Sequence, residues 1–318
     1  MANFLKSFFG GKAESPQDEK ERKGQKNFEI FKYDGIRALR MGRADYAIRC
    51  FHEALAIRKD METMDYLANT LIQTRELEEA RTILEEMTSL WPEESNIHIL
   101  LANVYFMLED YTNMKNAATK AQEQATENPA AYLLMAKAEH GLQDEFNAIA
   151  HLTTAIQKKD DYTDARLLRA KILMAMQQNE EAKEDVEAIL AANPEDENAL
   201  FLQGQLKERQ GDSKGAQDAY TRIIEANPFS EQAYLHLGTL LAKEGKLDEA
   251  IACYDEAIET LPQSADAYRE RGRAKLQKGD KQGSIEDMKK SMELNPEEEN
   301  RISGEFNNFK DLYANVPL

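Results

Sequence analysis

Five histidines are the side chains in this sequence best suited to acid–base chemistry or metal binding. They are His52, His98, His140, His151 and His236. None belongs to a His-Glu-x-x-His motif or to a His–Cys cluster, the arrangements that bring metal ligands together. His140 and His151 are close enough along the chain to share a metal ion, but we do not favour that interpretation. We therefore expect no metal centre and no cofactor.

Paired acids and glycine-rich loops are two other common sources of catalytic or phosphate-binding chemistry. Glu78–Glu79 and Glu180–Glu181 are acid pairs, but each lies at the start of an expected helix, where negative charge interacts favourably with the helix dipole. Apart from Gly10 and Gly11, the glycines are isolated, and none forms a phosphate-binding loop. The sequence therefore predicts a protein that is not an enzyme.

Small residues instead recur at a fixed spacing through most of the chain. The first step is 33 residues and each later step is 34, giving Gly35, Ala68, Ala102, Ala136, Ala170, Gly204, Gly238 and Gly272. A second small residue follows twelve positions after most of these, and prolines close several of the units. A period of this length is typical of stacked repeats.

Each period contains the pattern of two amphipathic helices. In residues 233–243 and 247–259, apolar side chains recur at i, i+3, i+4 and i+7. Gly245 lies between these segments and suits a helix end with a tight turn, while Pro262 stops the second helix. Small residues fit where two helices cross closely. The unbroken period predicts one all-α solenoid.

This pattern resembles the tetratricopeptide repeat family. The match is clearest at Tyr234, Leu237, Gly238, Leu241, Ala250, Tyr254, Ala257 and Pro262. The resemblance covers about residues 28–296, and it implies a right-handed superhelical solenoid of about eight helix-turn-helix repeats. Thr126 and Asp160 replace the closing proline in the middle repeats, and Pro129 comes three residues late, so irregular helix lengths or pitch are expected near residues 126–131.

The resemblance also implies where a partner binds, because in this family the first helix of each repeat lines the concave face. The position after each small residue carries amides and lysines in the middle repeats and no acid in any repeat. Two neighbouring positions are apolar in the middle repeats and predict a trough with polar edges. The predicted groove residues are Asn69, Ile99, Asn103, Phe106, Leu133, Lys137, Leu167, Lys171 and Met174. The same positions hold Phe201 and Gln205 farther along the chain.

One subclass of the family grips the C-terminal carboxylate of chaperones with a clamp of lysines and asparagines. Asp65 and Leu100 occupy two positions where that clamp needs Lys and Asn, so we exclude this assignment. Lys137 and Lys171 still favour acidic peptides, because a lysine can pair with a carboxylate.

Composition narrows the choice of partners and compartment. The net charge of −18 argues against binding to nucleic acid, which requires neutralisation of phosphates. Cys50 and Cys253 lie in distant repeats and we identify no secretion signal, so we expect a reducing compartment, the cytoplasm. No apolar run approaches the ~20 residues that span a bilayer.

Residues 1–27 are expected to be a flexible segment with a short amphipathic start. Four apolar side chains would share one helical face there, namely Phe4, Leu5, Phe8 and Phe9. This face suits a weak membrane-surface anchor or a short docking peptide. The alternative is a frayed terminus whose aromatic side chains pack on the first repeat or on nothing.

Residues 297–318 do not begin another full repeat. Apolar side chains recur at helical spacing there, at Ile302, Phe306, Phe309 and Tyr313. We expect a helix that caps the last repeat, as solenoids require. The alternative is a detachable helix that docks on another molecule and makes a dimer.

We therefore expect a non-catalytic scaffold that binds a peptide or helix of another protein in its concave groove. A second hypothesis is a homo-oligomeric assembly that self-associates through Phe306, Phe309 and Tyr313. A third is an assembly factor held at the periphery of a membrane by residues 1–9.

Overall fold

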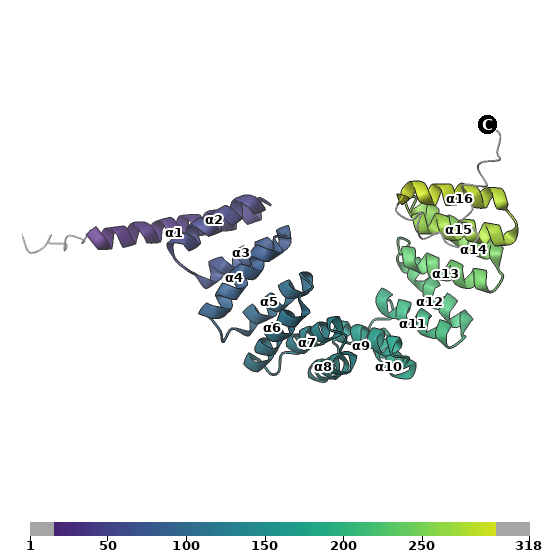
Figure 1. Cartoon of the computed structure of the whole chain (residues 1–318), viewed down its shortest axis with the longest axis horizontal. Helices are drawn as coiled ribbons and strands as arrows, with labels where there is room; N and C mark the ends of the chain where they lie inside the picture. Colours follow the sequence, from purple (N-terminus) through teal and green to yellow (C-terminus); the bar gives the residue numbers. More distant parts are fainter. Residues whose placement is uncertain (1–15, 297–318) are drawn as a thin grey trace, which may run out of the picture. The chain divides into compact units, whose positions relative to one another are not determined.

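The computed structural model describes residues 16–296, which form sixteen α-helices and no β-strand (Figure 1). The chain divides into two compact units between Asp160 and Asp161, called here the first unit and the second unit. The prediction of an all-α repeat fold is confirmed. The expected capping helix of residues 297–318 and the apolar start of the chain lie outside the described residues.

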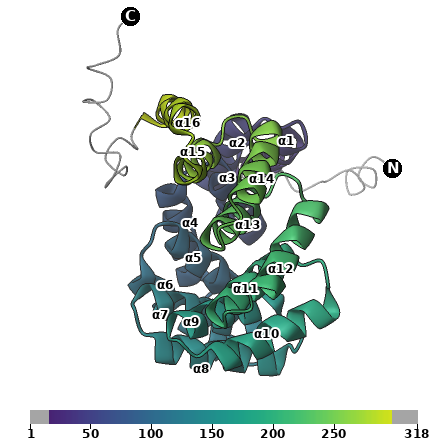
Figure 2. The same cartoon turned by 90° about the vertical axis from the view of Figure 1, so that its right-hand side faces the viewer.

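The helices form hairpins, with an odd-numbered first helix followed by an even-numbered second helix. In the first unit they are α1 (Pro16–Arg40), α2 (Ala44–Ile57), α3 (Met61–Thr74), α4 (Leu77–Leu90), α5 (Ser95–Met107), α6 (Tyr111–Gln124), α7 (Pro129–Gly141) and α8 (Glu145–Lys158). In the second unit they are α9 (Thr163–Ala175), α10 (Asn179–Ala192), α11 (Glu197–Arg209), α12 (Ser213–Ala226), α13 (Glu231–Lys243), α14 (Leu247–Thr260), α15 (Ala265–Lys278) and α16 (Lys281–Leu294). Within each unit every hairpin packs on the next, as Figures 1 and 2 show.

Each hairpin turns through a residue with left-handed backbone geometry. Four of these residues are glycines with φ between 69° and 95°, namely Gly42, Gly211, Gly245 and Gly279. The second to fifth hairpins use Arg75, Glu109, Gln143 and Gln177, with φ between 57° and 67°. The period of the repeat therefore imposes the same turn even where the sequence lacks the residue that adopts it most readily.

The small residues allow the two helices of a hairpin to approach closely. A Cβ atom placed on Gly204 would lie 2.5 Å from Cε1 of Tyr220, and one placed on Gly238 would lie 2.5 Å from Cε1 of Tyr254. The two tyrosines are fully buried and fill the space that the missing side chains leave. Gly204 and Gly238 are therefore each paired with an aromatic ring across the hairpin.

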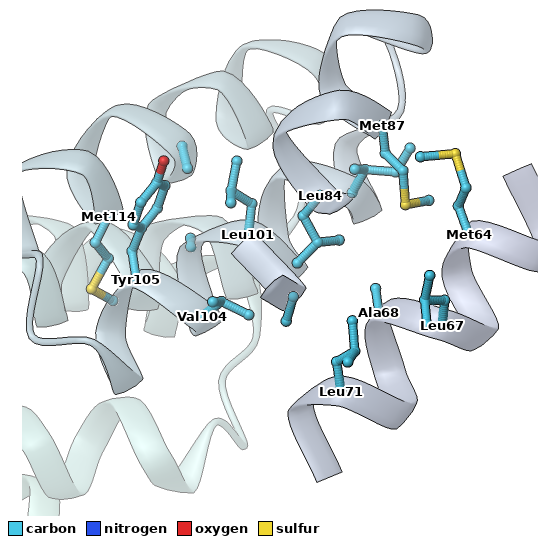
Figure 3. Close-up of a cluster of buried hydrophobic side chains, with 14 of the residues drawn as sticks. Met64, Leu67, Ala68, Leu71, Leu84, Met87, Leu101, Val104, Tyr105 and Met114 are labelled. Carbon is cyan, nitrogen blue, oxygen red and sulfur yellow. The ribbon is translucent and has the colours of Figure 1, made fainter. Parts of the chain in front are cut away.

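The core of the first unit runs continuously from hairpin to hairpin. Figure 3 shows side chains of α3 to α6 meeting in this cluster, among them Met64, Leu84, Leu101 and Met114. All four are buried. Each hairpin thus buries its apolar face against its neighbour, which is how a repeat protein builds a core along its length.

The middle of the chain keeps its regular helices although the closing proline is displaced. Pro129 is the first residue of α7, and the side chain of Asn128 before it accepts a hydrogen bond from the Ala130 N–H. Helices α6 and α7 have 14 and 13 residues, like the other second and first helices. Proline fits at the first helical position because it lacks the N–H that would be unpaired there.

Helix α1 begins earlier than the sequence indicated. Residues 16–27 were expected in a flexible segment, but α1 runs from Pro16 and has 25 residues. Its charged side chains are good helix formers, and Lys23 pairs with Glu19 one turn earlier, at 2.8 Å. Near Gly24 the helix also approaches Ile57 of α2. Helix propensity, charge pairing and contact with α2 together favour the helix over a linker.

Candidate functional site

The two asparagines of the predicted groove lie on successive first helices of the first unit. Asn69 is on α3 and Asn103 is on α5. Each donates one amide hydrogen to a backbone carbonyl of its own helix, at 2.9 and 3.0 Å, one turn earlier. An amide has a second N–H and a carbonyl oxygen, so each asparagine keeps hydrogen-bonding capacity for a partner.

Lys137 of α7 and Phe106 of α5 lie together in the first unit. The Lys137 Nζ atom is 5.3 Å from the centre of the Phe106 ring, and this ring is partly exposed. A cation over an aromatic face is a favourable arrangement. Ile99, about two turns earlier than Phe106 on α5, is half-buried against the core.

Leu133 was predicted to line the trough, but it is buried in the first unit. Helix α7 packs against α5, α6 and α8, so almost all of its apolar side chains are covered. The groove pattern alone could not reveal this, because it places a residue on a helix face without stating which neighbours cover that face.

In the second unit, the three predicted residues on α9 have different exposures. Lys171 is exposed and Leu167 is half-buried, whereas Met174 is buried. The last turn of α9 is covered by Arg209 of α11, whose guanidinium donates to the Met174 carbonyl. Met174 is therefore closed to a partner, and Lys171 is the predicted residue of α9 best placed to meet one.

A pocket of about 280 Å³ is open on the first helices of the second unit. Its lining comes from α9, α11, α13 and the turn before α13, and comprises Lys171, Glu197, Asn198, Phe201, Leu202, Gln205, Ser230 and Gln232. Apolar side chains, three amides and one lysine therefore converge there. Pockets with a few placed polar groups beside apolar walls are the usual form of a binding site.

One wall of the pocket is held rigid by hydrogen bonds. Glu197, the first residue of α11, accepts from Ser230 Oγ at 2.7 Å and from Asn227 Nδ2 at 2.9 Å. These bonds tie the start of α11 to the turn before α13. Both carboxylate oxygens of Glu197 are thus engaged, which makes this acid a structural part of the wall.

Phe201 is positioned by an aromatic cluster beside the pocket. Its ring meets His236 edge-on, with centroids 4.8 Å apart, and lies 5.8 Å from Tyr220. Tyr220 donates its hydroxyl hydrogen to Glu208 at 2.6 Å. Burial, together with the hydrogen bond to Glu208, raises the pKa of Tyr220 above its usual value. The tyrosine therefore stays neutral and supports the Phe201 ring.

Sequence reasoning recognised the positions of Phe201 and Gln205 but did not assign them to the trough. The trough was placed in the middle repeats, where the apolar residues are densest in the sequence. Asn198 and Gln232 gave no such signal, because they lie outside the repeated groove positions. The pocket depends on how α9, α11 and α13 pack, and this information is not present in any single repeat.

The histidines and cysteines show no catalytic arrangement within residues 16–296. His140 pairs with Glu145 at 2.8 Å, whereas His151 faces Glu139 at 3.4 Å. No three His, Cys, Asp or Glu side chains of the described residues gather as metal ligands would. None of the described helices combines the length and the apolar character needed to cross a membrane.

The fold and the surface of its first helices define a helical repeat protein of the solenoid class. The tetratricopeptide repeat model matches residues 167–231, 201–264 and 235–298, and a second model of the same repeat matches residues 61–91. Together these segments cover about half of the 318 residues. The chain belongs to the tetratricopeptide repeat family.

Solved structures of similar fold include a tetratricopeptide repeat protein from Parabacteroides merdae, with 18% identity and a TM-score of 0.59 over 74% of this chain and 93% of that one. PilF of Pseudomonas aeruginosa has 17% identity and a TM-score of 0.56, over 69% of this chain and 97% of its own. The Cut9–Hcn1 hetero-tetramer of the APC/C contains a chain with 16% identity and a TM-score of 0.55, over 89% of this chain and 57% of that one. At these identities the likeness shows the fold alone. No curated protein matches the sequence significantly.

Proposed function

We propose that this chain is a non-catalytic scaffold that binds a peptide or a helix of another protein on its first helices. The observation that carries this proposal is the pocket formed by α9, α11 and α13, in which Phe201 lies among three amides and Lys171. An apolar side chain of the ligand packs on Phe201, and the three amide side chains of the pocket form hydrogen bonds with the backbone of the ligand. Lys171 pairs with a carboxylate, so the ligand is an acidic peptide.

The first unit offers a related surface on α3, α5 and α7. Asn69 and Asn103 supply amides there, while Phe106 and Lys137 supply a ring and a charge. Each unit therefore carries its own set of apolar, amide and lysine side chains. One ligand with two segments, or two separate ligands, would use both surfaces.

Two further features bear on the compartment and on the class of ligand, and the cysteines support a reducing compartment such as the cytoplasm. Cys50 and Cys253 are both buried free thiols, and they lie in different units. The net charge of −18 supports a protein ligand over nucleic acid.

A peptide-display selection on the immobilised chain tests the proposal. Selected peptides are titrated into the wild type and into variants with Lys137→Glu, Lys171→Glu or both, with fluorescence anisotropy as the readout. We expect a Kd in the micromolar range, because ordering a short peptide offsets much of the contact energy. Lys171→Glu weakens ligands of the second unit, and Lys137→Glu weakens those of the first.

Lys214→Glu is the matched control, because Lys214 is exposed on α12, a second helix. This variant makes the same charge change away from the first helices and leaves the affinity as in the wild type. Equal binding of all selected peptides to the wild type and to the Lys137→Glu, Lys171→Glu double variant would reject the proposed surface.

A further inference from the structure

Exposed apolar side chains gather at the turns that follow α5 and α7 in the first unit. Phe106, Met107 and Leu142 are each more than a third exposed, and Phe146 is 77% exposed. Phe106 also belongs to the predicted groove, whereas the other three lie outside it. Contiguous exposed apolar surface on a folded protein commonly marks an interaction site.

Tyr111 joins the two turns into one surface. Its ring lies 6.4 Å from the Phe106 ring in an edge arrangement. The ring also stands against the backbone of Gly141, where a Cβ atom would come within 2.4 Å of Tyr111 Cδ1. Leu142 follows directly. We call this surface the turn patch, made of Phe106, Met107, Tyr111, Leu142 and Phe146.

The repeat fold does not require an aromatic residue at Phe146. The equivalent positions of the other repeats are Asp45, Glu78, Thr112, Glu180, Lys214, Asp248 and Gln282. All seven are polar, as expected for an exposed position near the start of a second helix. Phe146 therefore departs from the pattern at a site where packing within the first unit gains little from its ring.

Acidic side chains outnumber the lysine at the turn patch, Lys137, whose ammonium lies over the Phe106 ring. Glu109 and Asp110 lie in the turn after α5, Asp144 lies in the turn after α7, and Glu145 is the first residue of α8. Asp110 and Asp144 cap the following helices by accepting hydrogen bonds from uncharged backbone and amide groups. The hydrogen bonds from Asn147 lower the pKa of Asp144, so its carboxylate is charged at neutral pH. A ligand for the patch should be apolar and basic.

The first twelve residues of this chain have that chemistry. They contain Lys6 and Lys12 and no acid, in a protein whose net charge is −18. Their apolar residues would share one helical face, and these are Phe4, Leu5, Phe8 and Phe9. We propose that residues 1–12 of a second copy of this chain dock on the turn patch.

The distance that residues 1–12 can reach from Pro16 indicates that they dock on the turn patch of a second copy and not on the patch of their own chain. The turn patch lies where first helices end, whereas residues 1–12 join α1 at its beginning, Pro16. From Pro16 to Arg40, α1 extends roughly 36 Å. The seven steps from Phe9 to Pro16 span at most about 25 Å. Phe9 therefore cannot reach even the turn at the end of α1, which belongs to its own hairpin.

This contact joins two different surfaces, so two copies close as a dimer only when each binds the N-terminal residues of the other. When the exchange is in one direction, each bound copy still offers a free turn patch or free N-terminal residues, and the assembly grows into a chain or a ring. The attraction between Lys6 or Lys12 and the acidic turns is screened by salt. Assembly should therefore rise with protein concentration and fall with ionic strength.

A labelled synthetic peptide of residues 1–12, titrated with the full chain, tests the proposal by fluorescence anisotropy. We expect a micromolar Kd that weakens about tenfold in the Phe146→Glu variant. Other repeats carry Glu at this position, so the variant keeps the fold, which a thermal melt followed by circular dichroism checks. Sedimentation velocity of the full chain should show a series of assemblies that Phe146→Glu removes.

Phe229→Glu is the matched control, because Phe229 is 67% exposed and lies in the second unit. It should bind the peptide as the wild type does. Equal weakening by both substitutions would overturn the proposal, as would unchanged binding to Phe146→Glu. A peptide that binds vesicles of phosphatidylcholine and phosphatidylserine, but not the chain, would also overturn it and favour a membrane role for these residues.

Discussion

The two units build the same helix hairpin with different chemistry at one pair of positions. In the first unit, first-helix positions hold Leu67, Leu101 and Met135, which lie in one apolar cluster. The equivalent positions of the second unit include Arg169 and Arg271. Both arginines bind a buried aspartate of the following second helix. One unit therefore relies on apolar packing where the other uses ion pairs.

The ion pairs of the second unit have near-ideal geometry. Arg169 Nε and Nη2 each lie 2.7 Å from one oxygen of Asp185, and Arg166 Nη1 lies 3.1 Å from the carboxylate. Arg271 forms the same bidentate pair with Asp287, in which Nε and Nη2 lie 2.9 and 2.6 Å from the two carboxylate oxygens. A bidentate pair fixes how two helices align, but it is costly to desolvate. These ion pairs thus align the helices of the second unit, and removing one member of a pair should greatly reduce the stability of that unit.

The largest expected effect comes from breaking such a pair. Asp185→Ala removes the buried carboxylate that Arg166 and Arg169 both bind and should cost about 3–5 kcal/mol of the stability of the second unit. Amide hydrogen exchange of α9 to α12 measures the loss. Glu184→Ala is the control, because Glu184 is the exposed neighbour. The triple change Arg166→Met, Arg169→Met, Asp185→Leu should recover most of the stability, because it replaces the whole ion-pair cluster by apolar side chains. Similar exchange in Asp185→Ala and Glu184→Ala would contradict a stabilising role of the cluster.

The first unit should instead be sensitive to loss of apolar volume. Leu84 is fully buried in α4, so Leu84→Ala should cost about 3 kcal/mol through lost packing and a cavity. Trp91, the single tryptophan of the chain, lies against this core and reports unfolding of the first unit by fluorescence in urea. Leu90→Ala on the same helix is the control, because Leu90 is largely exposed. Equal losses for the two variants would show that burial does not decide the effect.

An acid in the first unit should make its stability depend on pH. Asp60 caps α3, and its partial burial alone would raise its pKa. Hydrogen bonds from Thr63 and Lys32 outweigh burial and hold the pKa of Asp60 below its usual value. Its contribution is therefore present above about pH 4 and lost as the pH falls through the lowered pKa.

Asp60→Asn should cost about 1 kcal/mol near pH 6, because Asn still caps the helix but loses the charge-assisted hydrogen bond with Lys32. Trp91 fluorescence in urea at pH 6 and pH 3 measures the difference between the variant and the wild type. We expect the difference to shrink at pH 3. A difference that is the same at both pH values would show that the charge of Asp60 does not stabilise the first unit.

The smallest expected effect lies at the turns, where the first unit carries more strain. In the described part of the first unit, positive φ occurs at three non-glycine residues, namely Arg75, Glu109 and Gln143. In the described part of the second unit it occurs at one, Gln177. Gln143→Gly should stabilise the first unit by roughly 0.5–1 kcal/mol, since glycine adopts this backbone without steric cost. Gly211→Gln should destabilise the second unit by a similar amount. If Gln143→Gly lowers the urea midpoint, the Gln143 side chain stabilises the first unit by more than the positive φ of Gln143 destabilises it.

Much of the fold can be predicted from signals within a single repeat. The small residue of each first helix, the i, i+3, i+4 pattern and the closing prolines are local signals, and their fixed period predicted the helix hairpins. The left-handed turn at Gln143 shows the limit of such signals. No glycine marks it, and the geometry follows from the packing of α7 on α8.

The proposed binding surface likewise depends partly on the sequence of single repeats and partly on tertiary packing. Periodicity and family resemblance identified the positions of Lys137 and Lys171, which lie at the surface because a solenoid exposes one face of each first helix. Only the packing of neighbouring helices decided that Leu133 and Met174 are covered and that Phe201 lines a pocket. The sequence by itself determined which residues share a face of a helix, because that depends on a period of 3.6 residues. The tertiary structure decided which parts of that face remain open, because coverage depends on contacts between different hairpins.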